Sequence, residues 1–170
     1  MKQSFYMRYV YPILAIAAIT TAAFFILSFD HTSESQTLAL QVDQIAVEDI
    51  ALDVWVADSS LEQRNGLSGK IREDLEDEGI DGMLFVFEEP SVQKFWMKNM
   101  LFDLDVVWIQ GRTVMMVHEE IPIYDPVRDC EGDACFTHMS SYPHMVDLVL
   151  ELPAGSVQMY EIEVGDILTR

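Results

Sequence analysis

Apolar and polar side chains alternate along most of the chain after Leu38, and a period of two residues predicts β-strands. The strands expected on this basis cover residues 38–42, 50–57, 82–87, 95–100, 103–110, 113–119, 145–152 and 156–164. In residues 145–152, the even-numbered positions are all valine or leucine, whereas the odd-numbered positions include Asp147 and Glu151. This alternation is typical of an antiparallel sheet with one buried face. Gln110-Gly111-Arg112 is a short link between two strong strands and predicts a hairpin.

Two short helices are expected between the strands at 50–57 and 82–87. Ser60 and Gln63 resemble a capping box at the start of a helix over 61–65, which would end in a left-handed cap at Gly66. Residues 71–78 carry five acidic and one basic side chain, so a helix there would be a solvated surface turn. Many short strands with one or two short helices predict a mainly β domain, either a small antiparallel sandwich or a barrel-like fold.

The first 29 residues contain a long stretch without a charge. Its twenty residues, 10–29, span about 30 Å as a helix, which is the thickness of a bilayer core. Lys2 and Arg8 precede the stretch and Asp30 follows it, so the positive-inside rule places the N-terminus in the cytoplasm. The predicted organisation is a cytoplasmic segment 1–9, a transmembrane signal-anchor 10–29, a linker 30–37 and an extracytoplasmic β-rich domain 38–170. A cleaved signal peptide, which also exports the domain, and a buried helix of a soluble protein are the alternatives.

Charge narrows the choice of partners. The chain of 170 residues has 29 acidic and 10 basic side chains, and residues 30–170 hold all 29 acids and 8 of the bases, a net charge of −21. Such a domain repels phosphate backbones, whereas nucleic-acid binders present cationic surfaces. DNA and RNA are therefore not expected as partners.

Several short motifs occur in a recognisable order. They are Arg64-Asn65-Gly66-Leu67, GMLFVF from Gly82, FWMKNM from Phe95, Leu104-Asp105, the two cysteines, Tyr142, and VLELPAG from Val149. Over roughly residues 47–168 this series resembles the domain-of-unknown-function-192 family. The resemblance implies a mainly β, sandwich-like fold, often behind a signal sequence or membrane anchor, with no established activity. Two positions depart from the family pattern: Ser68 stands where many members have Met, and Met100 where many have Thr.

The FWMKNM motif contains the most informative polar residues. Trp96 and Lys98 would share one strand face, and Asp105 in the next strand could reach the lysine. One hypothesis is a cleft in which Trp96, Lys98, Asn99 and Asp105 bind a small molecule, sugar or peptide. The alternatives are an ion pair or hydrogen-bond network at a sheet corner, with Asn99 in a turn, or a lysine that acts as a base.

Cys130 and Cys135 enclose an acidic loop of four residues. Outside the cytoplasm, two thiols at this spacing are expected to form a disulfide. A redox-active pair is the first alternative, although the neighbouring acids would raise the thiol pKa. A zinc site that also uses His138 and His144 is the second alternative. We expect no resident metal and no cofactor.

The sequence contains no nucleotide-binding loop, nucleophile elbow or zinc-protease motif, so no catalytic residue is named. The prediction is a membrane-anchored module of the cell envelope that binds a ligand or assists another protein. An envelope hydrolase, with or without a metal, and a structural domain that docks another membrane protein are the alternatives.

Overall fold

The computed structural model describes residues 40–123 and 138–170. The description below concerns the compact unit Leu40–Arg170. The predicted segments 1–9, 10–29 and 30–37 lie outside the described residues, so the signal-anchor stays a prediction. Among the residues that are described, no helix is long and apolar enough to cross a membrane.

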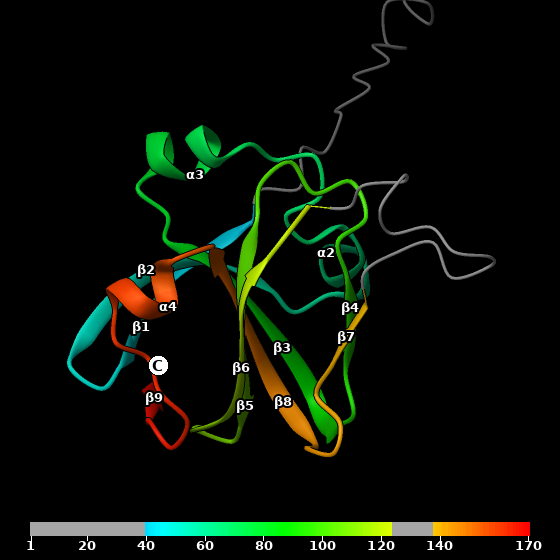
Figure 1. Ribbon diagram of the computed structural model, residues 1–170, viewed down its shortest axis with the longest axis vertical. Helices are drawn as coiled ribbons and strands as arrows, with labels where there is room; N and C mark the ends of the chain where they lie inside the picture. The colour runs from blue at the N-terminus through cyan, green and yellow to red at the C-terminus, as the bar shows by residue number, and fades with distance from the viewer. Residues whose placement is uncertain (1–39, 124–137) are drawn as a thin grey trace, which may run out of the picture. The chain divides into compact units, whose positions relative to one another are not determined.

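The domain is built mainly of β-strands, which confirms the predicted class. The strands are β1 (Gln41–Val47), β2 (Ile50–Ala57), β3 (Gly82–Ser91), β4 (Lys94–Trp96), β5 (Leu104–Gln110), β6 (Thr113–Ile121), β7 (His138–Ser140), β8 (Val146–Pro153) and β9 (Leu168–Thr169). Seven of them form one sheet that curls into a half-barrel, in the order β6-β5-β8-β3-β2-β1-β9, and β4 pairs with β7 beside it (Figure 1). The helices are α2 (Ser60–Asn65), α3 (Arg72–Glu78) and α4 (Ser156–Met159).

Strand pairing is antiparallel except between β2 and β3, which run parallel. A parallel pair needs a long crossover, and α2, α3 and their loops supply it between Ala57 and Gly82. A wholly antiparallel sheet was therefore the wrong expectation at this one pair. The predicted hairpin is confirmed, because Gly111 and Arg112 alone connect β5 to β6, with Gly111 at a φ of 61°.

The segment 156–164 is not the strand that alternation predicted. It contains the short helix α4, in which Tyr160 N–H donates to the Ser156 carbonyl over 2.8 Å. Gly155 precedes it in the left-handed region, with a φ of 87°, and this turns the chain away from the direction of β8. A carboxylate from β5 then accepts the Val157 N–H, so a tertiary contact overrides the local pattern.

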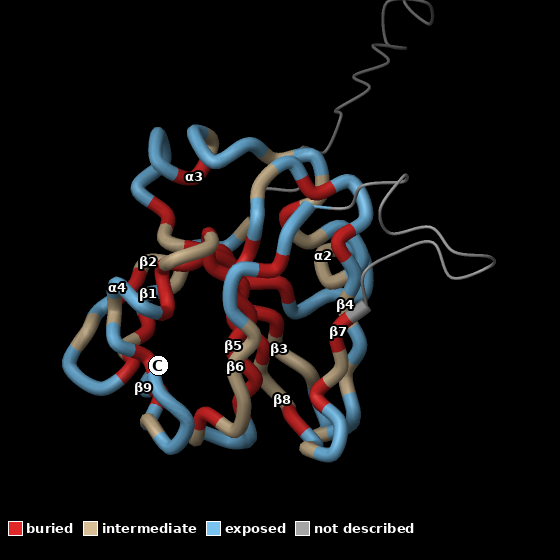
Figure 2. Tube along the Cα trace, viewed as in Figure 1, coloured by how far each residue is buried: buried red, intermediate tan, exposed pale blue. Residues whose placement is uncertain are grey.

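Apolar layers cover both faces of the sheet, contrary to the expectation of one solvated face. The first layer contains Trp55, Met83, Phe85, Leu104, Val106, Trp108 and Val149, together with residues outside the sheet such as Leu67, Met97 and Met100. The second contains Ile45, Leu52, Val54, Leu84, Val107, Ile109, Leu150 and Leu152, with Val157 and Ile162 from the C-terminal segment. Every residue of β5 from Leu104 to Ile109 is consequently buried (Figure 2).

The helix α2 begins one residue earlier than the sequence indicated. Its capping box is formed by Ser59 and Glu62, whose carboxylate accepts the Ser59 N–H at 3.0 Å, and not by Ser60 and Gln63. Gly66 ends the helix with a φ of 50° and a ψ of −139°, which is not the left-handed cap that was expected. In α3 the single buried side chain is Leu75, which fixes an otherwise acidic helix to the core.

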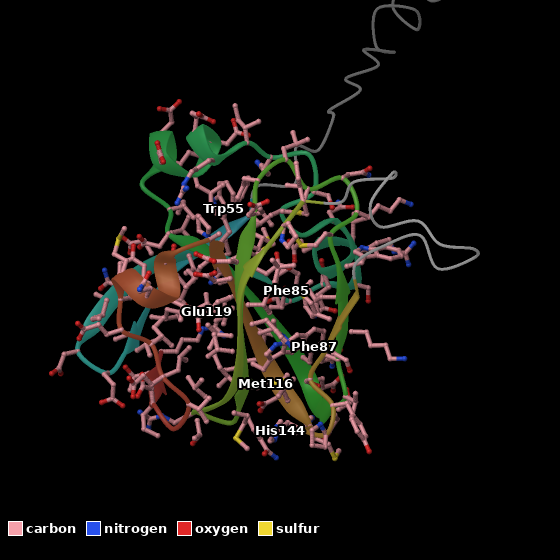
Figure 3. All side chains as sticks on the ribbon, viewed as in Figure 1. Trp55, Phe85, Phe87, Met116, Glu119 and His144 are labelled. Atoms are coloured by element: carbon pink, nitrogen blue, oxygen red, sulfur yellow. The ribbon has the colours of Figure 1, made fainter. Side chains whose placement is uncertain are left out.

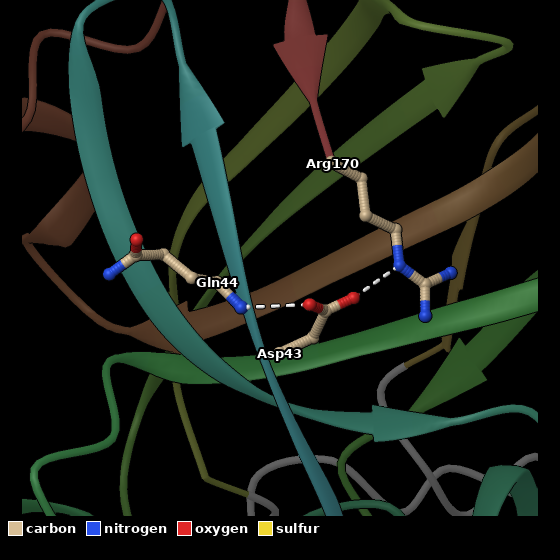
Figure 4. A network of polar contacts seen from close by, with 3 residues as sticks. All are labelled: Asp43, Gln44 and Arg170. Carbon is tan, nitrogen blue, oxygen red and sulfur yellow. Dashed lines mark hydrogen bonds and ion pairs between the residues drawn. The ribbon is translucent and has the colours of Figure 1, made fainter.

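The C-terminus closes the far edge of the sheet. Leu168 and Thr169 pair with β1, and the Arg170 guanidinium donates to the Asp43 carboxylate (Figure 4). The same carboxylate accepts the Gln44 N–H at 3.0 Å. The hydrogen bond from Arg170 lowers the pKa of Asp43. The last residues of the chain are therefore part of the folded domain.

Candidate functional site

An open groove lies between α2 and β4, on the side of the sheet that carries the Phe85 layer. It has a volume of about 360 Å³ and is lined by Gln63, Arg64, Phe87, Gln93, Lys94, Phe95 and Trp96. We call it the α2–β4 groove. Three aromatic side chains supply apolar surface and two cations lie among them, a combination typical of small-molecule sites.

A smaller space adjoins this groove. It has a volume of about 30 Å³ and is lined by Gln63, Arg64, Asn65, Gly66, Leu67, Ser68, Phe85, Phe95, Trp96, Met100 and Glu151. We call it the Glu151 chamber. The two spaces share Gln63, Arg64, Phe95 and Trp96, so a molecule in the groove can extend a group into the chamber. A space of this size holds about one water molecule.

Aromatic contacts hold β4 against the sheet. The Phe95 ring meets Phe85 edge-to-face with ring centroids 4.8 Å apart, and it meets Trp108 in the same way at 5.6 Å. Phe87 lies 6.5 Å from Phe95, and Figure 3 shows Phe85 and Phe87 on the same side of β3. Trp108 is itself fixed, because its Nε1–H donates to His118 Nδ1 at 2.8 Å. The aromatic floor of the groove is therefore rigidly packed.

Hydrogen bonds connect the two walls of the groove to the sheet and to each other. The Gln63 side-chain amide donates to the Val86 carbonyl at 2.7 Å, which attaches α2 to β3. After α2, the Ser68 hydroxyl donates to the Lys98 carbonyl at 3.0 Å, and Gly69 N–H donates to the Asn99 carbonyl at 2.9 Å. The loop after α2 and the turn after β4 thus form one unit, and the groove is preorganised.

Glu151 is the acid of the chamber. In β8 its register partners are Met83 of β3 and Val106 of β5, both fully buried, and the residue itself is only 5% exposed. No hydrogen bond or ion pair joins its carboxyl group to another described residue. Burial raises the pKa of Glu151 to about 8, so the group is mainly protonated at neutral pH.

Of the four residues predicted as a ligand site, Trp96 lines both the groove and the chamber. Lys98 and Asn99 are exposed in the turn that follows β4, where the Lys98 ammonium lies 5.4 Å from the centre of the Trp96 ring. Asn99 has a φ of 58°, which agrees with the alternative that it holds a turn. Neither residue lines the groove.

The structure does not bring Asp105 to this site. It is fully buried on the opposite side of β5 from Leu104 and Val106, which face the Phe85 layer. Its two carboxylate oxygens accept the Glu120 N–H at 2.8 Å and the Val157 N–H at 2.9 Å. Asp105 therefore connects β6 and α4 to β5. The expectation that its side chain would contact Lys98 across a hairpin was wrong.

The cysteine predictions fall outside the described part of the chain. Cys130 and Cys135 lie in 124–137, so the disulfide and its zinc and redox alternatives stay predictions. Among the described residues, no three histidine, cysteine or acidic side chains form a group that could hold a metal ion.

Sequence reasoning missed Arg64 and Glu151 as site residues. Arg64 was noted only as part of a motif. Glu151 was assigned to a polar face with Asp147, although all the other residues from Val149 to Pro153 are apolar. An acid inside such a run, in a strand long enough to cross a core, is the signal that could have identified it.

The chamber also unites the motifs that are scattered along the sequence. Arg64, Asn65, Gly66 and Leu67 come from the first motif, Phe85 from GMLFVF, Phe95, Trp96 and Met100 from FWMKNM, and Glu151 from VLELPAG. Together, the curled sheet and this shared chamber define a small mainly β domain with an aromatic groove between α2 and β4. The chain belongs to the domain-of-unknown-function-192 family, described as uncharacterised ACR, whose model matches residues 42–169.

Two solved structures share the fold. One is a protein from Sinorhizobium meliloti 1021 described as a candidate transcription regulator, with 26% identity, a TM-score of 0.62, and coverage of 76% of this chain and 94% of that one. The other is a protein of unknown function from Novosphingobium aromaticivorans DSM 12444, with 24% identity, a TM-score of 0.62, and coverage of 79% and 89%. No curated protein matches the sequence.

Proposed function

We propose that the domain is a ligand-binding module of the cell envelope, and that the α2–β4 groove binds a small molecule with a flat apolar part and an anionic group. The observation that carries this proposal is the convergence of four separate motifs on one groove and its chamber. If these motifs served only to stabilise the fold, their residues would not need to line the same solvent-accessible cavity.

The apolar part of the ligand would lie against Phe87, Phe95 and Trp96. Trp96 is 45% exposed although it is large and apolar, and its side chain lines the groove. Aromatic rings stack on such surfaces with little loss of side-chain entropy, because the wall is already packed.

The anionic group would be bound by Arg64 and Lys94. Both are exposed at the groove, and neither forms an ion pair or hydrogen bond through its side chain with another described residue. Residues 30–170 have a net charge of −21, so two cations at one groove form a local positive site. Such a site can bind a carboxylate or a phosphate.

The same charge argues against a nucleic-acid role. The description of the Sinorhizobium protein as a candidate transcription regulator is not extended to this chain, because 29 acids against 8 bases repel a phosphate backbone. Glycoside hydrolysis by a pair of carboxyl groups is also disfavoured, since Glu151 is the one acid among the described residues of the groove and chamber.

The location belongs to the proposal as well. The uncharged stretch 10–29 and the basic residues before it support a membrane anchor with the domain outside the cytoplasm. A disulfide between Cys130 and Cys135 would fit that compartment. A ligand of the cell envelope, such as a small molecule, sugar derivative or peptide, would reach the groove there.

Binding of phenylacetate to the full chain in a nonionic detergent tests the proposal. This probe has one carboxylate and one aromatic ring. We expect saturable shifts in the NMR spectrum, and an affinity at least about fivefold lower for Arg64→Gln, which removes a charge-assisted hydrogen bond. Arg72→Gln is the matched control, because Arg72 is exposed in α3 and pairs with Glu76 away from the groove. Equal affinities for the native protein and Arg64→Gln would contradict the assignment of the anion site.

A further inference from the structure

We propose that the Glu151 chamber receives one uncharged polar group of the ligand, a hydroxyl, which forms a hydrogen bond with the Glu151 carboxyl group. This inference rests on the proposed function, because it adds a second recognition point to a molecule that already occupies the α2–β4 groove. It identifies the ligand class as a hydroxyl-bearing anion with a flat apolar part.

The size of the chamber sets the first limit. A volume of about 30 Å³ is close to the share of one water molecule in liquid water, so the chamber accepts one small group and excludes a ring or a phosphate. The chamber adjoins the groove through Arg64, Phe95 and Trp96. A substituent at the far end of a ring in the groove is therefore the part of a ligand that fits.

The missing partner of Glu151 sets the second limit. The residue is 95% buried and lines the chamber, where its carboxyl oxygen Oε2 lies near Gly66, and no hydrogen bond joins the group to another described residue. Its hydrogen-bonding capacity is therefore open to a group in the chamber. A group of the ligand in the chamber can supply a hydrogen bond to this carboxyl group. The chamber is therefore more than a gap in packing, because it contains a specific polar group to be satisfied.

The surroundings of Glu151 favour an uncharged partner. Its neighbours in the sheet are Met83 and Val106, and Leu67, Phe85, Phe95, Trp96 and Met100 line the chamber. Arg64 of α2 is the one described cation in the lining, and no ion pair joins it to Glu151. Burial of an ion pair among these apolar groups would require the desolvation of both charges.

The hydrogen-bonding capacities of the two groups match. A protonated carboxyl group has one donor and one free acceptor, and a hydroxyl group also has one donor and can accept. The pair can therefore form reciprocal hydrogen bonds. The raised pKa of Glu151, about 8, agrees with this form of the group at neutral pH.

Three probes that differ at one position test the inference. They are phenylacetate, 4-hydroxyphenylacetate and 4-(aminomethyl)phenylacetate, titrated into the full chain in nonionic detergent at pH 7. We expect the hydroxyl probe to bind about fivefold more tightly than phenylacetate, which is the gain from one net hydrogen bond. Glu151→Gln should keep this preference, because an amide also donates and accepts, whereas Glu151→Ala should remove it. Glu89→Gln, at an exposed position of β3, is the matched control.

The other outcomes are distinct. Equal affinities for phenylacetate and the hydroxyl probe, with binding that still depends on Arg64, would overturn the inference and leave the proposed function in place. A preference for the amine probe that Glu151→Gln abolishes would overturn it in favour of a buried ion pair. Failure of all three probes to bind would contradict the proposed function itself.

Discussion

The buried carboxyl group of Glu151 makes the stability of the domain depend on pH in an unusual direction. Its pKa in the folded protein is about 8, against an ordinary value of 4.5. Between these values the folded state holds a proton that the unfolded state has released, so the free energy of unfolding falls as the pH rises. The contribution is fully present below pH 4.5 and is lost as the pH rises through 8.

The substitution Glu151→Gln isolates this effect, because an amide has the shape of the protonated acid but does not titrate. The slope is about 1.4 kcal/mol per pH unit, so the variant should match the native protein near pH 4.5 and exceed its stability by about 3 kcal/mol at pH 7. The difference should level off on the order of 5 kcal/mol above pH 8.

Urea unfolding followed by tryptophan fluorescence at pH 5, 6, 7 and 8 measures this difference, since Trp55 and Trp108 are buried in the domain. His118 has a pKa lowered by burial, so it contributes stability that is lost as the pH falls, and this contribution is common to both proteins. Glu89→Gln should follow the native curve. Parallel curves for the native protein and Glu151→Gln would refute the reasoning.

Three further substitutions examine the scaffold and the groove. Gly82→Ala places a methyl group 2.1 Å from the Glu151 carbonyl oxygen, so the β3–β8 pair must move apart and we expect a loss of about 3 kcal/mol or more in urea unfolding. Asp105→Asn replaces one accepting oxygen with an NH₂ donor that faces a backbone N–H such as that of Val157. We expect the free energy of unfolding to fall by about 2 kcal/mol. An unchanged urea midpoint would show that the carboxylate is not needed there. Trp96→Ala should change stability by less than about 1 kcal/mol, because the side chain is 45% exposed, yet weaken phenylacetate binding at least about fivefold.

Much of the sheet could be predicted from the sequence because alternation is a local property. The strands at 50–57, 103–110 and 145–152 and the two-residue hairpin at Gly111 all follow from side-chain order alone. The segment 156–164 shows where this fails. Its backbone follows the Asp105 carboxylate, which is 52 residues away in the sequence and accepts the Val157 N–H. No local pattern contains that contact.

The candidate site was harder to predict because the period of two says which residues share a face but not what covers that face. Trp96 and Lys98 do lie close together and both are exposed, although β4 ends at Trp96 and Lys98 belongs to the turn that follows. Asp105 was assigned to the wrong surroundings, because β5 belongs to a different sheet from β4 and turns this side chain to the opposite apolar layer.

Glu151 illustrates the same difficulty, because the sequence pattern placed at the surface a residue that the fold buries. Alternation placed it among polar residues, but the crossover through α2 and the return of β4 cover that face of β8 and convert an apparent surface acid into a buried one. Gly66 is part of this cover, because a side chain there would lie 3.2 Å from the Phe85 ring and the backbone has a positive φ. The residues that close the core over Glu151 are thus the residues that line its chamber. The chamber therefore forms only when the crossover is in place, and no local pattern in the sequence contains it.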